Sequence, residues 1–352
     1  MTKIAAKGEE DNFNYGFAAL KIFMTFEVIL CHYWTYVNIK NMPFYLKFFD
    51  VFRLLAVPVF MIMSFYFFCE KNYICQNKHN IKRRLARLII PYVVWGVIYY
   101  LCYTLIEMAY NIKLLNGISD LGWQLFLGCS RNLNPPLWFQ ADLIILTLLF
   151  WGISRLMSID KSVNVIFGLI VISLFVQYSG INYRFFGELE YESRYTCGRI
   201  FEMIPFACIG LIISYYKIEK KLYRVRRTCI MLSVCFLALL IRFPIFSDVD
   251  LQFTYAGLNV ICAASFVVLI FLLIPFHRLP LIVLNCIRGG VKYTAGIYYL
   301  HYGIGKIVMS FLSEIGFQKG TFMQCILILI ICYIISFIIF QMPFKICKQL
   351  VT

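Results

Sequence analysis

The chain has 352 residues, of which 61% are hydrophobic and 14% charged, and its mean hydropathy is +0.77. Soluble domains carry about 25% charged residues, so this composition excludes a soluble domain and indicates an integral membrane protein. The formal net charge of +15 makes nucleic acid a candidate partner until the placement of the charges is considered.

The first fourteen residues are polar, and no short apolar region ends in a small-residue cleavage site. We therefore expect the first apolar segment to be retained as a membrane span. Most of the fourteen cysteines lie within apolar segments and form no CxxC pairs. Cysteine behaves there as a small buried hydrophobe, so we predict no disulfide framework and no metal site. We also expect no bound cofactor.

Apolar segments long enough, or nearly so, to cross a bilayer follow one another along the chain. We predict ten of them, near residues 16–37, 50–69, 88–110, 137–157, 164–180, 200–216, 228–245, 255–275, 293–312 and 323–343. The expected fold is an all-α bundle of about ten transmembrane helices. We expect residues 16–343 to form one transmembrane domain, between a cytoplasmic N-terminal tail (1–15) and a cytoplasmic C-terminal tail (344–352).

Basic residues alternate between the connections. If the N-terminus is inside, the tails and even-numbered loops hold 21 of the 33 lysines and arginines, whereas the opposite side holds nine. This bias predicts that both termini are cytoplasmic. The net charge then reflects topology and contact with anionic membrane lipids, and nucleic-acid binding is not expected.

The first segment places Lys21 and His32 eleven residues apart in one apolar helix. Eleven residues turn through about 1100°, so the two side chains lie within about 20° of one face and about 16 Å apart along the axis. A charged group at such a depth costs at least about 2.5 kcal/mol, which makes both residues functional candidates. Glu27 lies about 120° away and must meet another helix or a cavity.

Each member of the pair also has a structural explanation. A lone histidine such as His32 is often a packing residue, and a lysine such as Lys21 readily extends its ammonium to the headgroups. Their alignment favours function, because imidazole exchanges protons near neutral pH and suits a general base.

Residues 82–92, KRRLARLIIPY, open the third segment with Arg84 and Arg87 three residues apart. Guanidinium groups match phosphate oxygens, so the pair is a candidate for the phosphates of a nucleotide-bearing acyl donor. The alternative is an ordinary positive-inside cluster.

Other polar residues lie within the later segments. Ser64, Asp142 and His301 could belong to a relay or join helices by hydrogen bonds. We interpret Trp138 and Tyr298 first as packing or interfacial aromatics, with a role in the site as a second possibility. Two long connections on the predicted outer side, 111–136 and 181–199, could shape a polar acceptor site or be ordinary solvated loops.

Several blocks, in order along the chain, resemble the membrane acyltransferase 3 family, which includes bacterial O-acetyltransferases of surface polysaccharides. The blocks are NYGFAALKIFMTFEVILCH around Lys21 and His32, VPVFMIMSFYFF (57–68), Arg84-Leu-Ala-Arg87 followed by Pro91, LWFQADLI (137–144) and GIYYLH (296–301). Three positions depart from the family pattern: Ala18 replaces a common Asp, Lys21 replaces the usual Arg, and Phe65 replaces a Gly.

The resemblance implies transfer of an acyl group, expected to be acetyl, from cytoplasmic acyl-CoA to a hydroxyl of a cell-surface or lipid-linked glycan. His32 is then the catalytic base or acyl relay, Lys21 its basic companion, and Arg84 and Arg87 handle the donor or organise the core. The expected location is a bacterial cytoplasmic membrane. On composition alone, a transporter or exporter of glycan or lipid-linked intermediates fits equally well, and an inactive relative acting as a membrane partner is a third possibility.

Overall fold

The computed structural model describes residues 13–34, 49, 52–74, 78–128, 130, 132–157, 159–179, 199–242, 257–317 and 320–351. Most of the predicted N-terminal tail and of the connection 181–199 therefore lies outside the described residues. The described part is helical and contains no strand, so the all-α prediction is confirmed.

Each of the ten predicted segments contains a helix. In chain order these are α2 (Tyr15–Tyr33), α4 (Ala56–Phe68), α5 (Lys78–Tyr110), α7 (Trp138–Leu156), α8 (Ile159–Tyr178), α11 (Arg199–Tyr215), α13 (Arg226–Arg242), α14 (Leu258–Leu273), α16 (Thr294–Glu314) and α17 (Phe322–Gln341). Shorter helices connect them: η2 (Cys69–Ile74), α6 (Ile118–Leu127), η3 (Pro135–Leu137), α12 (Ile218–Leu222), η5 (Tyr223–Val225), η7 (Phe276–Arg278), α15 (Leu281–Gly290), η8 (Val291–Tyr293) and α18 (Lys345–Val351).

Not every helix is long enough to span a bilayer by itself. Among the described residues, four helices meet both length and hydropathy requirements: Tyr15–Tyr33, His79–Tyr110, Pro135–Leu156 and Phe322–Gln341. A fifth span is possible if the pair Arg199–Tyr215 and Ile218–Leu239, bent by 62°, crosses as one unit. The protein is thus a multi-pass membrane protein, whereas the count of ten and the cytoplasmic termini stay predictions.

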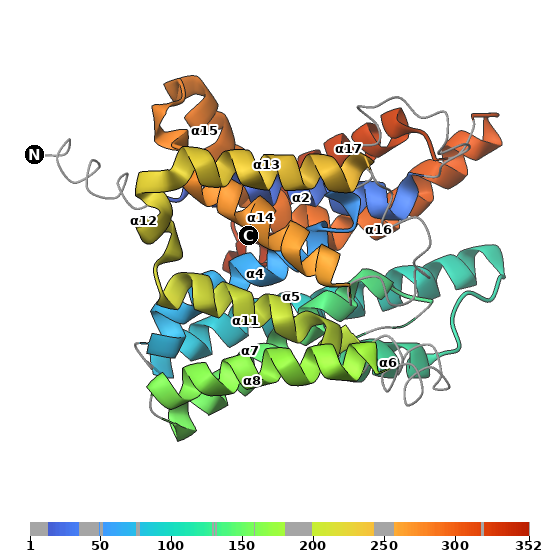
Figure 1. The fold of residues 1–352 in the computed structure, drawn as a ribbon. Coiled ribbons are helices and arrows are strands. Elements are labelled where there is room, and N and C mark those ends of the chain that lie inside the picture. Colours follow the sequence, from blue (N-terminus) through green and yellow to red (C-terminus); the bar gives the residue numbers. More distant parts are fainter. Residues whose placement is uncertain are drawn as a thin grey trace, which may run out of the picture.

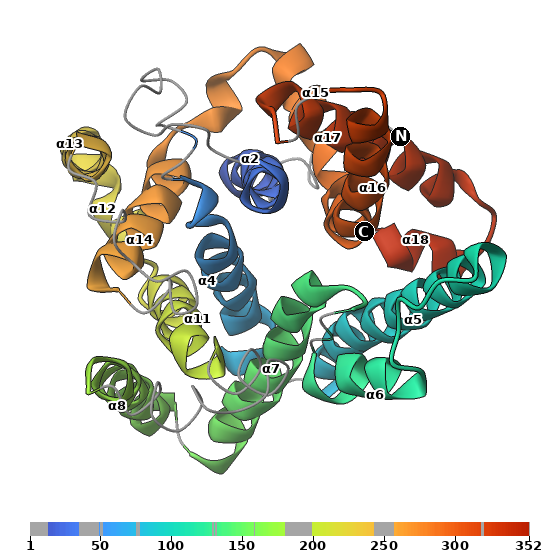
Figure 2. The ribbon, with the colours of Figure 1, turned by 90° about the vertical axis from the view of Figure 1, so that its right-hand side faces the viewer.

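The main helices run side by side as a bundle (Figure 1). Seen along their axes, α2 and α4 lie inside, and α8 and α13 lie at the periphery (Figure 2). Helix α2 contacts α4, α14, α15, α16 and α17. Because of this central position, α2 packs into two separate hydrophobic clusters.

The N-terminal half of α2 packs into a first core with α4, α7, α11 and α14, through Phe17, Leu20, Met24 and Val28. Its C-terminal end packs into a second core with α5, α16, α17 and α18. Lys21 therefore lies along the part of α2 that meets the first core, and His32 lies where α2 meets the second.

A glycine on α11 explains how α4 accommodates Phe65. A Cβ atom on Gly210 would lie 2.3 Å from the carbonyl oxygen of Ile62, so glycine permits the close approach of the two helices. Phe65 points elsewhere and is fully buried, with edge-on contacts to Phe68 and Phe150. The small residue that close packing requires is thus supplied by the partner helix rather than by position 65.

The predicted C-terminal tail forms α18, which packs against α5, α16 and α17. Trp95 on α5 donates its indole N–H to the carbonyl of Leu350, over 3.1 Å, and Val351 is fully buried. The end of the chain therefore belongs to the second core.

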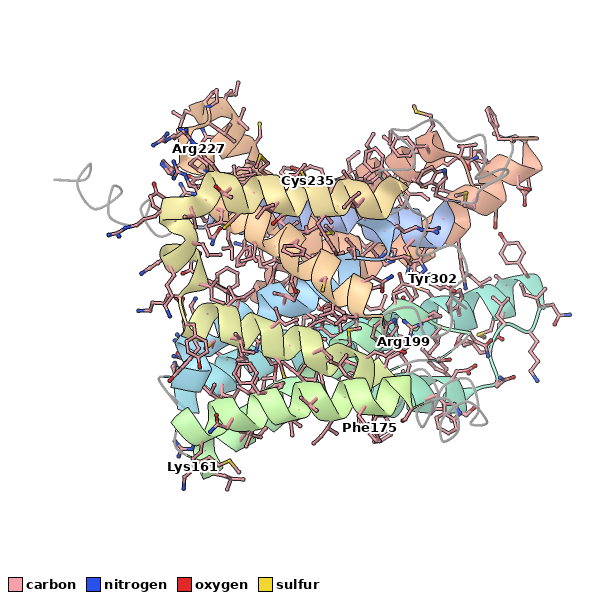
Figure 3. The ribbon with its side chains drawn as sticks, in the orientation of Figure 1. Lys161, Phe175, Arg199, Arg227, Cys235 and Tyr302 are labelled. Carbon is pink, nitrogen blue, oxygen red and sulfur yellow. The ribbon has the colours of Figure 1, made fainter. Side chains whose placement is uncertain are left out.

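The basic loops, which the charge bias assigns to one side of the membrane, lie at one end of the bundle. Lys161 and Arg227 lie at this end, and Arg199 and Tyr302 lie toward the other (Figure 3). The shared placement of the basic loops is what the charge bias requires.

Candidate functional site

Helix α2 carries the predicted pair. It begins at Asn14, whose side chain accepts a hydrogen bond from the Phe17 amide over 2.9 Å, and it continues unbroken to Tyr33. This cap satisfies one of the free amides of the first turn. His32 lies in the last turn with an exposed side chain, whereas Lys21 is half-buried and Glu27 is fully buried.

His301 on α16 faces His32. The two imidazole centroids are 5.2 Å apart, with the ring planes tilted by 40°. His301 is fully buried, and its Nδ1 lies 2.5 Å from the carbonyl oxygen of Tyr298. Because a carbonyl only accepts, Nδ1 carries the hydrogen and Nε2 of the neutral ring is an acceptor. That Nε2 is buried and has no hydrogen-bond partner within the described part of the chain.

Two tyrosines fix the segment of α16 that carries His301. Tyr33 donates its hydroxyl to the carbonyl of Tyr302 over 2.5 Å. Tyr99 on α5 donates to the carbonyl of Tyr299 over 2.8 Å and accepts from the amide of Gly303 over 3.1 Å.

Glycines let these rings approach the helix. A Cβ atom at Gly305 would lie 2.2 Å from the Tyr33 ring, and one at Gly303 would lie 2.8 Å from the Tyr99 ring. Side chains from α2 and α5 thus hold α16 on both sides of His301.

The start of α7 joins the same region. Tyr298 donates its hydroxyl to the carbonyl of Pro136, and its ring centroid is 5.9 Å from that of His301. Phe139 packs edge-on against Tyr298, with centroids 6.1 Å apart. The aromatics Trp138 and Tyr298, interpreted from the sequence as packing residues first, therefore connect α7 to the histidine pair.

An arginine and two carboxylates complete the cluster. The guanidinium of Arg199 lies 4.4 Å from the centroid of the Trp138 ring. Asp142 and Glu202 are buried, and Asp142 interacts electrostatically with both Arg199 and Glu202. His32 interacts electrostatically with His301 and with Arg199. Groups from α2, α7, α11 and α16 thus converge at one place.

Arg199 and Glu202 were not among the site residues predicted from the sequence. Arg199 counted as part of an outer connection, because the apolar segment began only after it. The sequence did contain one signal: Arg199 lies three residues before Glu202 at the start of a helix, so both side chains lie on one helical face.

Arg84 and Arg87 have different surroundings. Arg84 donates to the Ser64 hydroxyl over 2.8 Å, to the Ser64 carbonyl over 3.3 Å and to the Thr147 hydroxyl over 3.2 Å. Its guanidinium also lies over the ring of Phe68, at 5.0 Å. These contacts join α4, α5 and α7. Arg87 is exposed, and within the described part of the chain its one hydrogen bond goes to the carbonyl of Arg83 on its own helix, over 3.4 Å.

The residues that the structure brings together are His32, His301, Tyr298, Trp138 and Asp142. Imidazole groups can accept a proton from a hydroxyl and return it to a leaving group. Lys21, Ser64, Arg84 and Arg87 have no described contact with this cluster. The described contacts thus separate a histidine cluster, at the C-terminal end of α2, from the cationic residues on the remaining lengths of α2 and α5.

The comparisons with known proteins show the family of this chain. The family model Acyl_transf_3, described as an acyltransferase domain, matches residues 14–341. Neither the curated proteins nor the solved structures with which the chain was compared include a match. Because the family match covers nearly the whole chain, this protein belongs to the acyltransferase 3 family and is a multi-pass membrane acyltransferase.

Proposed function

We propose that this protein transfers an acyl group, expected to be acetyl, from cytoplasmic acyl-CoA to a hydroxyl of a cell-surface or lipid-linked glycan in a bacterial cytoplasmic membrane. The observation that carries the proposal is the exposed imidazole of His32, whose ring centroid lies 5.2 Å from that of the buried His301. A reachable base beside a second, oriented imidazole suits activation of a hydroxyl.

The donor is proposed to approach from the end of the bundle that holds the basic loops. Arg87 has its guanidinium exposed there and can hold a phosphate of the donor. Arg84 organises the core in this proposal, since its donors already join α4 to α7. Lys21 lies on α2 between that end and His32, where its positive charge favours an anionic donor.

In the proposed reaction, His32 takes up one proton and later returns it. The acceptor hydroxyl gives its proton to His32, and its oxygen forms a bond to the carbonyl carbon of the thioester. The carbon–sulfur bond then breaks, and the leaving thiolate takes the proton from His32 to give free CoA. In the alternative route His32 itself accepts the acyl group and passes it to the hydroxyl.

Labelled acetyl-CoA, supplied to purified protein in liposomes with a glycan acceptor, tests the proposal. We expect His32→Ala to abolish acyl transfer while the protein still inserts and folds. His277→Ala, at an exposed histidine of η7, is the matched control and should retain activity. Undiminished transfer by His32→Ala would contradict the assignment.

The same assay separates the enzyme from the transporter. Acyl transfer with release of CoA supports the enzyme. Movement of glycan across the liposome membrane without consumption of acetyl-CoA would support a carrier, which family membership disfavours.

A further inference from the structure

Arg199 is the first residue of α11 and is held against the first residue of α7. Its guanidinium lies 4.4 Å from the centroid of the Trp138 ring, and Trp138 is itself buried. An arginine in this setting remains charged, and stacking on an indole restricts the plane of its donors.

Two buried carboxylates lie beside Arg199. Asp142 is fully buried, and neither of its carboxylate oxygens has a hydrogen-bond partner within the described part of the chain. A buried carboxylate without hydrogen bonds is unfavourable unless a positive charge compensates it. Arg199 interacts electrostatically with Asp142 and offsets part of this cost.

The arginine also acts on the other side of the cluster. Electrostatic interaction links Arg199 to His32, and Arg199 and Tyr302 lie toward the same end of the bundle in Figure 3. Tyr302 contacts the His32 ring, with centroids 5.9 Å apart. A positive charge stacked on Trp138 therefore acts on the base.

We propose that Arg199 is a further catalytic residue, which binds the carbonyl oxygen of the acyl group and stabilises the oxyanion formed when the acceptor hydroxyl attacks. This inference rests on the proposed acyl transfer. In the step, the hydroxyl oxygen bonds to the carbonyl carbon and its proton moves to His32. The carbonyl electron pair moves to the oxygen beside Arg199, then returns as the carbon–sulfur bond breaks.

Two reactions of the wild-type protein in liposomes provide the test. One is transfer of the acetyl group from acetyl-CoA to the glycan, and the other is hydrolysis of acetyl-CoA without acceptor. Both pass through an oxyanion, so Arg199→Gln should lower kcat of both by the same factor, about 10²–10³-fold. The KM for acetyl-CoA should change little, because the contact forms in the transition state.

Further variants exclude a purely structural role. Arg199→Lys should keep about tenfold more activity than Arg199→Gln, because the charge remains and the fork of donors is lost. Added guanidinium should restore part of the activity of Arg199→Gln. Arg155→Gln, at an exposed arginine of α7, is the matched control and should behave as wild type. If Arg199→Gln does not fold, the kcat values of Arg199→Lys and of the wild-type protein are compared instead, and this comparison tests the inference.

Unchanged kcat in a folded Arg199 variant would overturn the inference. Loss of glycan transfer with undiminished hydrolysis would also overturn it, because Arg199 would then bind the acceptor. If the wild-type protein transfers no acyl group, the proposed function itself fails, and this outcome is seen before any variant is tested.

Discussion

The two imidazoles at the centre of the site have opposite surroundings, although their rings are 5.2 Å apart. His32 is exposed at the end of α2, whereas His301 is buried and oriented by the Tyr298 carbonyl. The exposed ring of His32 can contact the substrate. The buried ring of His301 has an acceptor nitrogen and can orient the ring of His32. Catalysis at this site should therefore depend on both residues.

Replacing His301 tests the role of its Nε2 atom. Asn at position 301 can still donate to the Tyr298 carbonyl but has no acceptor in place of Nε2. We expect His301→Asn to lower kcat for acyl transfer by about 10²–10⁴-fold, the usual contribution of acid–base groups. Thermal unfolding in detergent should show a folded protein, and full activity of this variant would show that Nε2 takes no part.

At the same scale, replacing Arg84 should affect stability, whereas replacing Arg87 should affect the KM for acetyl-CoA. Arg84→Met removes charged hydrogen bonds between helices, so we expect it to lower the free energy of unfolding by about 1.5–3 kcal/mol. Arg87→Ala should change stability by no more than about 0.5 kcal/mol and raise the KM for acetyl-CoA by about tenfold. Denaturation in detergent and steady-state kinetics give both quantities, and the reverse pattern would contradict these roles.

At the scale of elements, α4 and α11 approach each other through a glycine rather than through the Ser64-Phe65-Tyr66 block. The Cβ position of Gly210 lies against the backbone of α4, and the Phe65 ring fills space beside Phe150. The bulky residue at position 65 is thus compatible with a tightly packed first core.

Gly210→Ala should therefore destabilise the protein. Its Cβ would lie 2.3 Å from a backbone oxygen that cannot rotate away, and such overpacking costs about 1–3 kcal/mol. Gly152→Ala on α7 is the control, because nothing lies within 4 Å of its Cβ position, and it should stabilise by about 0.5–1 kcal/mol. Equal unfolding temperatures for both variants would rule out this explanation of the α4–α11 contact.

At the scale of the whole molecule, one end of the bundle carries the basic loops and the other carries the histidine cluster. Lys161 and Arg227 lie opposite to Arg199 and Tyr302 in Figure 3. The charge rule assigns the basic end to the cytoplasm. In the proposed reaction, acyl donor and acceptor are then expected to meet the bundle from opposite sides.

Epitope tags test this orientation. Tags inserted after Lys161 or Arg227, or fused to either terminus, should react with antibody only after the cells are permeabilised. A tag after Lys113 should react in intact spheroplasts, because that connection is predicted to be outside. Reaction of only one terminus in intact spheroplasts would contradict ten spans, since an even number of crossings places both termini on one side.

Much of the architecture follows from local patterns. Hydropathy located a helix in each of the ten segments, and helical periodicity placed Lys21 and His32 on one face of α2. The short helices α6, α15 and α18 were not predicted, since with 10, 10 and 7 residues they are too short for the membrane spans that hydropathy locates. The packing of α18 into the second core depends on contacts with α5 and α16 far earlier in the chain.

By itself, the sequence determined the membrane class, the helical segments and the family, and it predicted His32 as a site residue, because hydropathy, periodicity and motif spacing depend on neighbouring residues. Only the tertiary structure decided that His301 faces His32, that Arg84 is enclosed while Arg87 is exposed, and that Arg199 joins the cluster through Trp138. These relations depend on how helices distant in sequence cross and pack. Side-chain shape and close glycine contacts set that packing, and no local pattern records it.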